Sequence, residues 1–455
     1  MSTTLPDNTT RAGRGFRRDR LILGMLTAAL AGLVVHHTLT LPMPKSLVVA
    51  APRQTRITGD ASMSFEKALL ERFAREHGVN LTFVLTDTPE ETLELVEGGR
   101  AQIGLALGVA PQEVSAHDAK ASKKKSKIAF GPEYDRQPIY AVDWNEGFAP
   151  PEDASGALGE LLRVAASFSV SPRQAPALPL DALHLLLPFV AEVRDTAPTL
   201  HEASYRFVWR TDVPRLDKAM RAFWDELLAD ESLDHLRERT LGFLPADPDP
   251  FEMAMLRRTL AINVPEHRKT IERAARKWGL DPFLLTAVIH QESRFDPDAV
   301  SATGVRGLMQ MTGSTLAELN VKNPGDPAEV IHAGARYLDL LRRQFADMGY
   351  DDEDAMLLAL AAFNVGQGHV QDAIDLLRGE GDSDDELPTW LGVRQALPLL
   401  ANAKVAQRTR YGLCRGAEAV EFVDKVRYFT FAIRGLVLAS AEGNELSGLR
   451  LALAD

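Results

Sequence analysis

The apolar positions of the chain follow one period in its first part and another in its second part. Between residues 46 and 107, short apolar runs alternate with segments in which apolar residues recur every three or four positions. The short runs predict strands at 46–50, 79–85 and 101–107, and the longer segments predict helices at 65–77 and 89–97. Gly78 and Gly98 follow these helices, as is typical of helix C-termini. This alternating order predicts an α/β domain with a parallel sheet.

Beyond residue 210 the apolar pattern becomes helical. The sequence predicts a strand at 206–210, one long amphipathic helix at 217–239 and a linker at 245–250. The periodic segments after Phe251 all predict helices: 264–278, 281–293, 315–319, 327–348, 353–365, 370–378, 391–407 and 416–440. The fold class is therefore multidomain, with an α/β domain expected at 44–248 and an all-α domain at 249–455.

The N-terminal segment has the pattern of an export signal. Five arginines stand within residues 1–20, and Leu21 to Val35 follow without a charge. A positive flank before an apolar stretch is typical of a secretory signal, and an uncleaved one serves as an anchor. A buried N-terminal helix of a cytoplasmic protein would not need five arginines before it. We therefore expect residues 1–43 to be a signal peptide or signal anchor of a periplasmic, membrane-associated protein, held at the inner membrane or peripherally at the outer one.

Composition excludes several classes of function. Asp and Glu number 63 and Lys and Arg 51, so the formal net charge is −12. A chain this acidic is a poor candidate for nucleic-acid binding, which depends on Lys and Arg neutralising phosphates. Cys414 is the single cysteine, which excludes an intramolecular disulfide, a Cys-rich zinc site and a Cys-held iron–sulfur cluster. We find no metal-ligand spacing and expect neither a metal nor a cofactor.

Glu292 is the candidate acid of the chain. Leu285, Val288 and Glu292 are spaced to share one helix face, which places the carboxyl at the C-terminal end of an apolar stripe. Loss of water and the negative end of the helix dipole would both raise its pKa, as a general acid requires. The alternative is a glutamate at a helix end that points into water. The aspartates nearby at 296 and 298 are better explained as turn residues, and those at 351–354 as a helix N-terminus.

Four short blocks follow one another within the helical half. They are ESRFDP at 292–297, SATGVRGLMQMT at 301–312, AFNVG at 362–366 and EAVEFV at 418–423. Together they resemble the soluble-lytic-transglycosylase domain, a lysozyme-like all-α fold that acts on peptidoglycan, over about residues 280–436. The segment TRYGLCRGAEAVEFV at 409–423, with the α/β region before it, is similar to the membrane-bound lytic murein transglycosylase F family. In that family a periplasmic solute-binding-protein-like domain precedes the catalytic domain.

The resemblance implies a mechanism with one carboxyl. Glu292 matches the sole catalytic acid/base, which protonates the glycosidic oxygen between N-acetylmuramic acid and N-acetylglucosamine in peptidoglycan glycan strands. It then takes the proton of the muramic C6 hydroxyl, which attacks C1 and gives a 1,6-anhydro end without consuming water. Glycoside hydrolysis normally needs two carboxyls flanking the bond, whereas this reaction needs one.

The resemblance also implies a substrate site. Its further residues are Ser301, Met309, Gln310, Phe363, Asn364 and Glu418. Ser301 and Gln310 match polar groups near the acid, and Met309 lies in the block that lines the groove. Phe363 stands where most relatives have tyrosine, so the hydroxyl of that tyrosine is missing here. Alternatives stay open for these residues: Ser301 as a turn cap, Gln310 as a partner of the backbone only, and Met309 as core.

Two rival functions and one departure from the family remain. A lysozyme-type hydrolase would need a second carboxyl, and a non-catalytic protein would only bind peptidoglycan or muropeptides. In the front domain the resemblance implies a small ligand, an amino acid or a muropeptide. Relatives usually have a ligand-binding arginine in the region around 112–127, where this chain has lysines, and the second lobe between 164 and 210 is short. We hypothesise a degenerate or regulatory binding module rather than a transport receptor.

Overall fold

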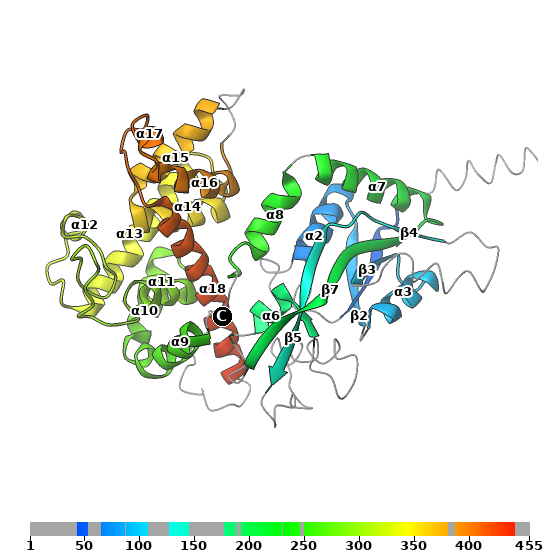
Figure 1. The fold of residues 1–455 in the computed structure, drawn as a ribbon, viewed down its shortest axis with the longest axis horizontal. Helices are drawn as coiled ribbons and strands as arrows, with labels where there is room; N and C mark the ends of the chain where they lie inside the picture. The colour runs from blue at the N-terminus through cyan, green and yellow to red at the C-terminus, as the bar shows by residue number, and fades with distance from the viewer. Residues whose placement is uncertain are drawn as a thin grey trace, which may run out of the picture. The chain divides into compact units, whose positions relative to one another are not determined.

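The structure is a computed structural model that describes residues 43–52, 65–86, 88–107, 127–144, 177–186, 188, 193–229, 231–245, 250–380 and 387–441 (Figure 1). Contacts divide the chain into two units. The α/β unit comprises Met1–Pro52, Glu71–Tyr134 and Tyr205–Ala229. The helical unit comprises Arg53–Leu70, Asp135–Ser204 and Asp230–Asp455.

The α/β unit contains the predicted parallel strands. β1 (Ser46–Pro52) pairs in parallel with β2 (Asn80–Thr86) on one side and with β3 (Ile103–Leu107) on the other. α2 (Phe65–His77) connects β1 with β2, and α3 (Pro89–Glu97) connects β2 with β3. The α/β domain with a parallel sheet is thus confirmed.

Close packing of α3 on the sheet explains one glycine. A Cβ at Gly104 of β3 would lie 2.7 Å from the Val96 side chain of α3, so only glycine lets helix and strand approach this closely.

Two further strands extend this sheet, and the first of them runs opposite to β1, β2 and β3. β7 (Val193–Arg210) pairs antiparallel with β3 and with the short β4 (Ile128–Phe130). The ring of Phe223 in α7 (Pro214–Ala229) meets Phe73 of α2 edge-on at 5.3 Å between centroids. The strand predicted at 206–210 is the end of β7, whereas β4 was not predicted because its three residues are too few to show a period.

The helical unit confirms the all-α prediction for the second half of the chain. Its helices are α9 (Pro250–Ile262), α10 (Val264–Trp278), α11 (Pro282–Ser293), α12 (Gly313–Glu318), α13 (Pro327–Asp347), α14 (Asp352–Val365), α15 (Gln367–Glu380), α16 (Trp390–Ala396), α17 (Ala403–Ala406) and α18 (Gly416–Ala441), with a 3₁₀ turn at Leu397–Ala401. α11 and α14 are buried along most of their length and both contact α18. A helix that is apolar on all sides is a central one, and α14 has that character. The same unit holds β5 (Asp135–Trp144), β6 (Ala177–Pro179) and α6 (Leu180–Leu186).

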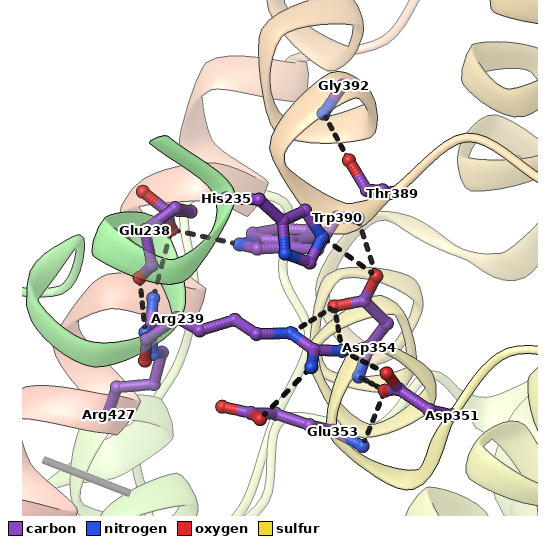
Figure 2. Close-up of polar contacts among 10 residues, drawn as sticks. All are labelled: His235, Glu238, Arg239, Asp351, Glu353, Asp354, Thr389, Trp390, Gly392 and Arg427. Atoms are coloured by element: carbon purple, nitrogen blue, oxygen red, sulfur yellow. Dashed lines mark hydrogen bonds and ion pairs between the residues drawn. The ribbon is translucent and has the colours of Figure 1, made fainter. Parts of the chain in front are cut away.

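The single helix predicted at 217–239 is wrong, since the structure has two helices there. α7 ends at Ala229 and α8 runs from Ser232 to Leu241. α8 belongs to the helical unit, where Glu238 lies buried at 8% exposure. One carboxylate oxygen of Glu238 accepts hydrogen bonds of 3.1 Å from Trp390 Nε1, Arg394 and Arg427. Figure 2 shows Glu238 with Trp390 and Arg427.

A second set of contacts fixes the other side of α8. Arg239 forms ion pairs with Asp351, Glu353 and Asp354 at the start of α14 (Figure 2). Burial by itself would raise the pKa of Asp354, but His235, the Trp390 N–H group and Arg239 hold that pKa below its ordinary value. The Asp351 side chain also accepts from the N–H groups of Glu353 and Asp354, as predicted for a helix N-terminus. α8 is therefore part of the helical unit, although it precedes the domain boundary expected at 248.

No helix within the described residues has the length and apolar character needed to cross a membrane. The expected signal or anchor lies outside the described residues, except Met43, and the lysine-containing loop is outside them up to residue 126.

Candidate active site

Glu292 stands in the last turn of α11. The helix begins at Asp281, whose side chain accepts from the Phe283 N–H group, with Pro282 in the first turn. It ends without glycine: Arg294 and Phe295 both have positive φ values, 54° and 66°. This backbone is costly for residues with a side chain, and burial of Phe295 at 1% exposure compensates for it. The helix end that carries Glu292 is therefore fixed by its own turn and by the core.

The Glu292 carboxyl is half-buried and has no polar partner. Within the described residues no side chain or backbone group forms a hydrogen bond or an ion pair with it. Burial raises the pKa of Glu292 to about 8. The carboxyl therefore keeps its proton at neutral pH, which is the state a general acid needs.

A tight loop lies opposite this carboxyl, between residues 299 and 311. An isolated bridge pairs Val300 with Arg306, and the turn within it uses a positive φ of 84° at Gly304. The Ser301 hydroxyl accepts from the Val305 N–H group at 3.0 Å and shares a 3.0 Å hydrogen bond with Thr303. Ser301 thus shapes the loop, in line with the turn-cap alternative, while its residue also lines the pocket described below.

Gln310 closes the same loop. Its Nε2 donates to the carbonyl oxygens of Gly307 at 2.7 Å and Ala299 at 3.1 Å. Its Oε1 is buried and has no hydrogen-bond partner within the described part of the chain. The backbone of Gln310 has a positive φ of 45°, which is a strained conformation for a residue with a side chain. An acceptor is thereby left available beside the acid.

Ser293 joins the helix end to the loop, and the sequence analysis did not single it out. Its hydroxyl donates to the Leu308 carbonyl at 2.7 Å. Its signal in the sequence was its position directly after Glu292 in the first block; its partner Leu308 belongs to the second block. This hydrogen bond fixes the distance between the acid and the loop that carries Gln310.

Six of the seven predicted site residues line one pocket of about 530 Å³. They are Glu292, Ser301, Gln310, Phe363, Asn364 and Glu418, and they come from α11, the loop, α14 and α18. Met309 does not line it. That side chain is buried at 1% exposure, and its sulfur lies 2.2 Å from the position that a Cβ at Gly334 of α13 would take, so it packs in the core. Met311 takes a place in the pocket lining instead.

An aromatic row forms one wall of the pocket. The Phe363 ring lies 5.6 Å from the ring of Tyr337 on α13 and stacks at 6.4 Å on buried Phe422 of α18. Tyr337 lines the pocket, and burial, together with the charge of Glu318, raises its pKa. A tyrosine hydroxyl is therefore present although Phe363 has none. Sequence analysis missed Tyr337, whose only signal was a polar aromatic among the apolar residues of the helix predicted at 327–348.

The other titratable groups nearby have different surroundings. Glu418 is exposed and forms a 3.2 Å ion pair with Arg415. Asp296 accepts from the Asp298 N–H group, as predicted for turn residues. His290 is buried against the Phe429 ring, and burial lowers its pKa to about 4. No group of three or more metal-ligating side chains exists among the described residues.

Comparison with known proteins shows the family of the chain. Residues 269–385 match the family model described as the transglycosylase SLT domain. Membrane-bound lytic murein transglycosylase F 2 of Alkalilimnicola ehrlichii is 30% identical over 403 residues, which cover 81% of this chain and 86% of the relative. The chain belongs to the membrane-bound lytic murein transglycosylase F family. This confirms the resemblance found in the four sequence blocks. Another member of the transglycosylase F family, from Stutzerimonas stutzeri, is 34% identical over half of this chain and 46% of its own length.

Two kinds of solved structure are also similar to this member of the transglycosylase F family. An inactive mutant of the lytic transglycosylase Slt from Pseudomonas aeruginosa aligns with 21% identity and a TM-score of 0.29, covering 48% of this chain and 34% of that one. The GluR0 ligand-binding core from Nostoc punctiforme in complex with glutamate aligns with 13% identity and a TM-score of 0.30, covering 42% and 98%.

Proposed function

We infer that the pocket around Glu292 cleaves the β-1,4 bond between N-acetylmuramic acid and N-acetylglucosamine in peptidoglycan, leaving a 1,6-anhydro end. Family membership supports lytic murein transglycosylase activity. The observation that carries the role of Glu292 is its carboxyl, half-buried and unpartnered, with a pKa of about 8, in the pocket that gathers the predicted residues. A carboxyl that is neutral at pH 7 has a proton to give.

The reaction needs this one group twice. Glu292 first donates its proton to the glycosidic oxygen as the bond from that oxygen to the muramic C1 breaks. The resulting carboxylate then takes the proton of the C6 hydroxyl as O6 bonds to C1. The proton lost from Glu292 stays on the released sugar, and the proton from O6 restores the acid. No water enters, so the reaction balances with a single carboxyl.

The neighbouring groups suit recognition of a sugar. Gln310 Oε1 offers a buried acceptor, Asn364 an exposed amide and Tyr337 a hydroxyl on the aromatic row. We propose that they orient the muramic acid so that its C6 hydroxyl faces Glu292. Met309 supports the loop behind them rather than contacting the substrate.

Glu418 is the residue that a hydrolytic reaction in this pocket would use. It is a further carboxyl on the same pocket, which a lysozyme-type hydrolase would require. Its side chain is exposed and pairs with Arg415, which favours a supporting role in binding.

Analysis of the released fragments distinguishes these reactions. Purified peptidoglycan is digested with the chain from residue 44, with its Glu292→Gln variant, and with Glu421→Gln as a control on an exposed glutamate outside the pocket. Mass spectrometry should show 1,6-anhydro ends with the parent chain and the control, and none with Glu292→Gln. Reducing ends, heavier by one water, would establish a hydrolase and assign a role to Glu418. Binding without any release would indicate a non-catalytic protein.

We also propose that the chain is periplasmic and attached to a membrane through its N-terminal segment, and that its α/β region binds a small ligand such as an amino acid or muropeptide. Calorimetry should use the chain from residue 44 rather than a fragment ending at 248. Such a fragment would separate α8 from Arg427 and Trp390, with which it forms buried hydrogen bonds. Saturable binding would show an intact site, and no binding across a broad panel would indicate a degenerate module.

A further inference from the structure

Exposed apolar side chains are concentrated in the segment after α16. Leu399, Tyr411 and Leu413 are 51%, 51% and 64% exposed. The described residues include nine large hydrophobic side chains with such exposure, and these three lie within fifteen positions. A concentration of exposed apolar side chains at one place marks an interaction surface.

This segment is held firmly, so its exposure is not that of a free loop. Asp372 of α15 is 2% exposed, and its two carboxylate oxygens accept from the N–H groups of Arg410 at 3.0 Å and Tyr411 at 2.8 Å. The Cys414 N–H group donates to the Leu400 carbonyl at 3.2 Å. The Tyr411 ring rests on Gly368, where a Cβ would lie 2.6 Å from it. The structure therefore fixes an exposed ring in one orientation.

The ring stands beside the Glu292 pocket. Gly366 and Arg415 both line that pocket. Tyr411 contacts Gly368, two residues after Gly366, and precedes Arg415 by four positions. Tyr411 is therefore at the side of the pocket where α14 ends and α18 begins.

The same segment is cationic in an acidic protein. No Asp or Glu occurs between residues 387 and 417, which include Arg394, Lys404, Arg408, Arg410 and Arg415. Arg394 and Arg415 are paired with acids of the helical unit. Among the described residues, Arg408 and Arg410 have no acidic partner, and Arg410 lies 5.4 Å from the centre of the Tyr411 ring. The Arg410 guanidinium is thus available beside the ring, and exposed Arg408 stands two positions before it in the chain.

We propose that Tyr411, Arg408 and Arg410 form a subsite for the peptide-bearing part of the glycan strand, next to the pocket that cleaves it. The proposal rests on the proposed function, because it extends the same substrate. A tyrosine ring presents a flat apolar face that matches the C–H face of a pyranose. Guanidinium groups bind carboxylates with paired, charge-assisted hydrogen bonds, and the peptides attached to muramic acid end in and carry carboxylates. The ring would bind sugar, and the arginines would bind the peptide.

Binding measurements in a Glu292→Gln background test this without cleavage. The two probes are peptidoglycan strands with their peptides and strands from which an amidase has removed them. Arg408→Gln with Arg410→Gln should weaken binding to peptide-bearing strands about tenfold and leave peptide-free strands unchanged, since two charge-assisted contacts are lost. Tyr411→Ala should weaken the binding of both probes. Tyr411→Phe should bind them like the parent because it keeps the ring.

The matched control is Arg273→Gln with Arg276→Gln, which removes two exposed positive charges from α10, away from the pocket lining. If this control weakens binding as much as the 408/410 pair, the effect is one of net charge and the subsite is wrong. Equal affinity of the 408/410 variant and the parent for peptide-bearing strands would also overturn it. The arginines are exposed, so their variants test the proposal even if Tyr411→Ala unfolds. If binding behaves as expected but the parent chain, with Glu292 intact, releases no anhydro products, the proposed reaction is refuted and the subsite is kept.

Discussion

Two glutamates of the helical unit are withdrawn from water in opposite ways. Glu238 of α8 is surrounded by donors, with Trp390, Arg394 and Arg427 on one carboxylate oxygen. Glu292 of α11 has no polar partner among the described residues, and burial raises its pKa to about 8. The first arrangement stabilises a structure, and the second keeps a proton available at a cost in stability. Burial alone therefore does not distinguish a structural glutamate from a candidate acid; the presence or absence of hydrogen-bond partners does.

The largest expected effect is on catalysis at Glu292. Glu292→Gln keeps the shape of the side chain but removes the proton donor and acceptor, so kcat/KM on peptidoglycan should fall at least about 10³-fold. The fall is measured by release of soluble fragments. Glu421→Gln should keep the parent rate. If Glu292→Gln retained a tenth of the activity, another residue would have to be the general acid.

The next effect is on stability at Glu238. Glu238→Ala removes the acid on α8 that pairs with buried Arg427. We therefore expect the free energy of unfolding to fall by about 3–5 kcal/mol. Denaturant titration measures it, with Glu421→Ala as the exposed control, expected to stay within about 0.5 kcal/mol. Equal values for both variants would mean that α8 does not contribute to the stability of the helical unit.

The pH dependence of the rate should follow the raised pKa. Because the first step needs protonated Glu292, kcat/KM should fall about tenfold per pH unit once the pH rises above about 8. Below that value the acid is protonated and the rate should not depend on its titration. A decline that begins near pH 5 would show a carboxyl with ordinary surroundings instead.

The unfolding free energies of the parent and of its Glu292→Gln variant should diverge as the pH rises. The folded-state pKa of about 8 lies above the ordinary value of 4.5, so the folded protein loses stability relative to the unfolded chain as pH rises from 4.5 to 8. Glutamine does not titrate. Glu292→Gln should therefore match the parent at pH 4 and exceed its unfolding free energy at pH 9 by several kcal/mol, since one pKa unit corresponds to about 1.4 kcal/mol. An advantage that is equal at both pH values would contradict this account.

The smallest expected effect concerns the tyrosine hydroxyl of the pocket. Tyr337→Phe keeps the aromatic row with Phe363 and removes only the hydroxyl, so kcat/KM should fall about fivefold, as for one lost hydrogen bond. Phe363→Tyr serves as the companion variant, because it restores the hydroxyl that most relatives have at that position. No change in Tyr337→Phe would exclude a contact between this hydroxyl and the sugar.

Much of the fold was predictable because its signals are local. The helix predicted at 264–278 has those bounds in the structure, with apolar spacing inside it and Gly279 after it. The break between α7 and α8 was missed because no glycine or proline interrupts residues 217–239. The contacts that place α8 join residues more than 100 positions apart, such as Glu238 and Arg427, and neither partner has a local signal.

The site was also predictable where its signals are local in the sequence, and it was missed where they are not. The four blocks named six residues of one pocket, since each block is short and specific in composition. They did not reveal that Met309 turns inward, because direction depends on the space left at Gly334 of a helix 25 positions away. They also missed Tyr337 and Ser293, whose roles depend on which groups the folded chain places beside them.

The contacts of α8 bear on how such a chain can be inherited and rearranged. A gene segment beginning at residue 249 would encode Arg427 and Trp390 without Glu238, and so would leave a buried cation and an indole without their acceptor. A recombination event that moves these helices to a new front domain would therefore keep these hydrogen bonds only if the breakpoint falls before α8. By its contacts, α8 belongs with the helices that supply those hydrogen bonds and not with α7, which precedes it in the chain.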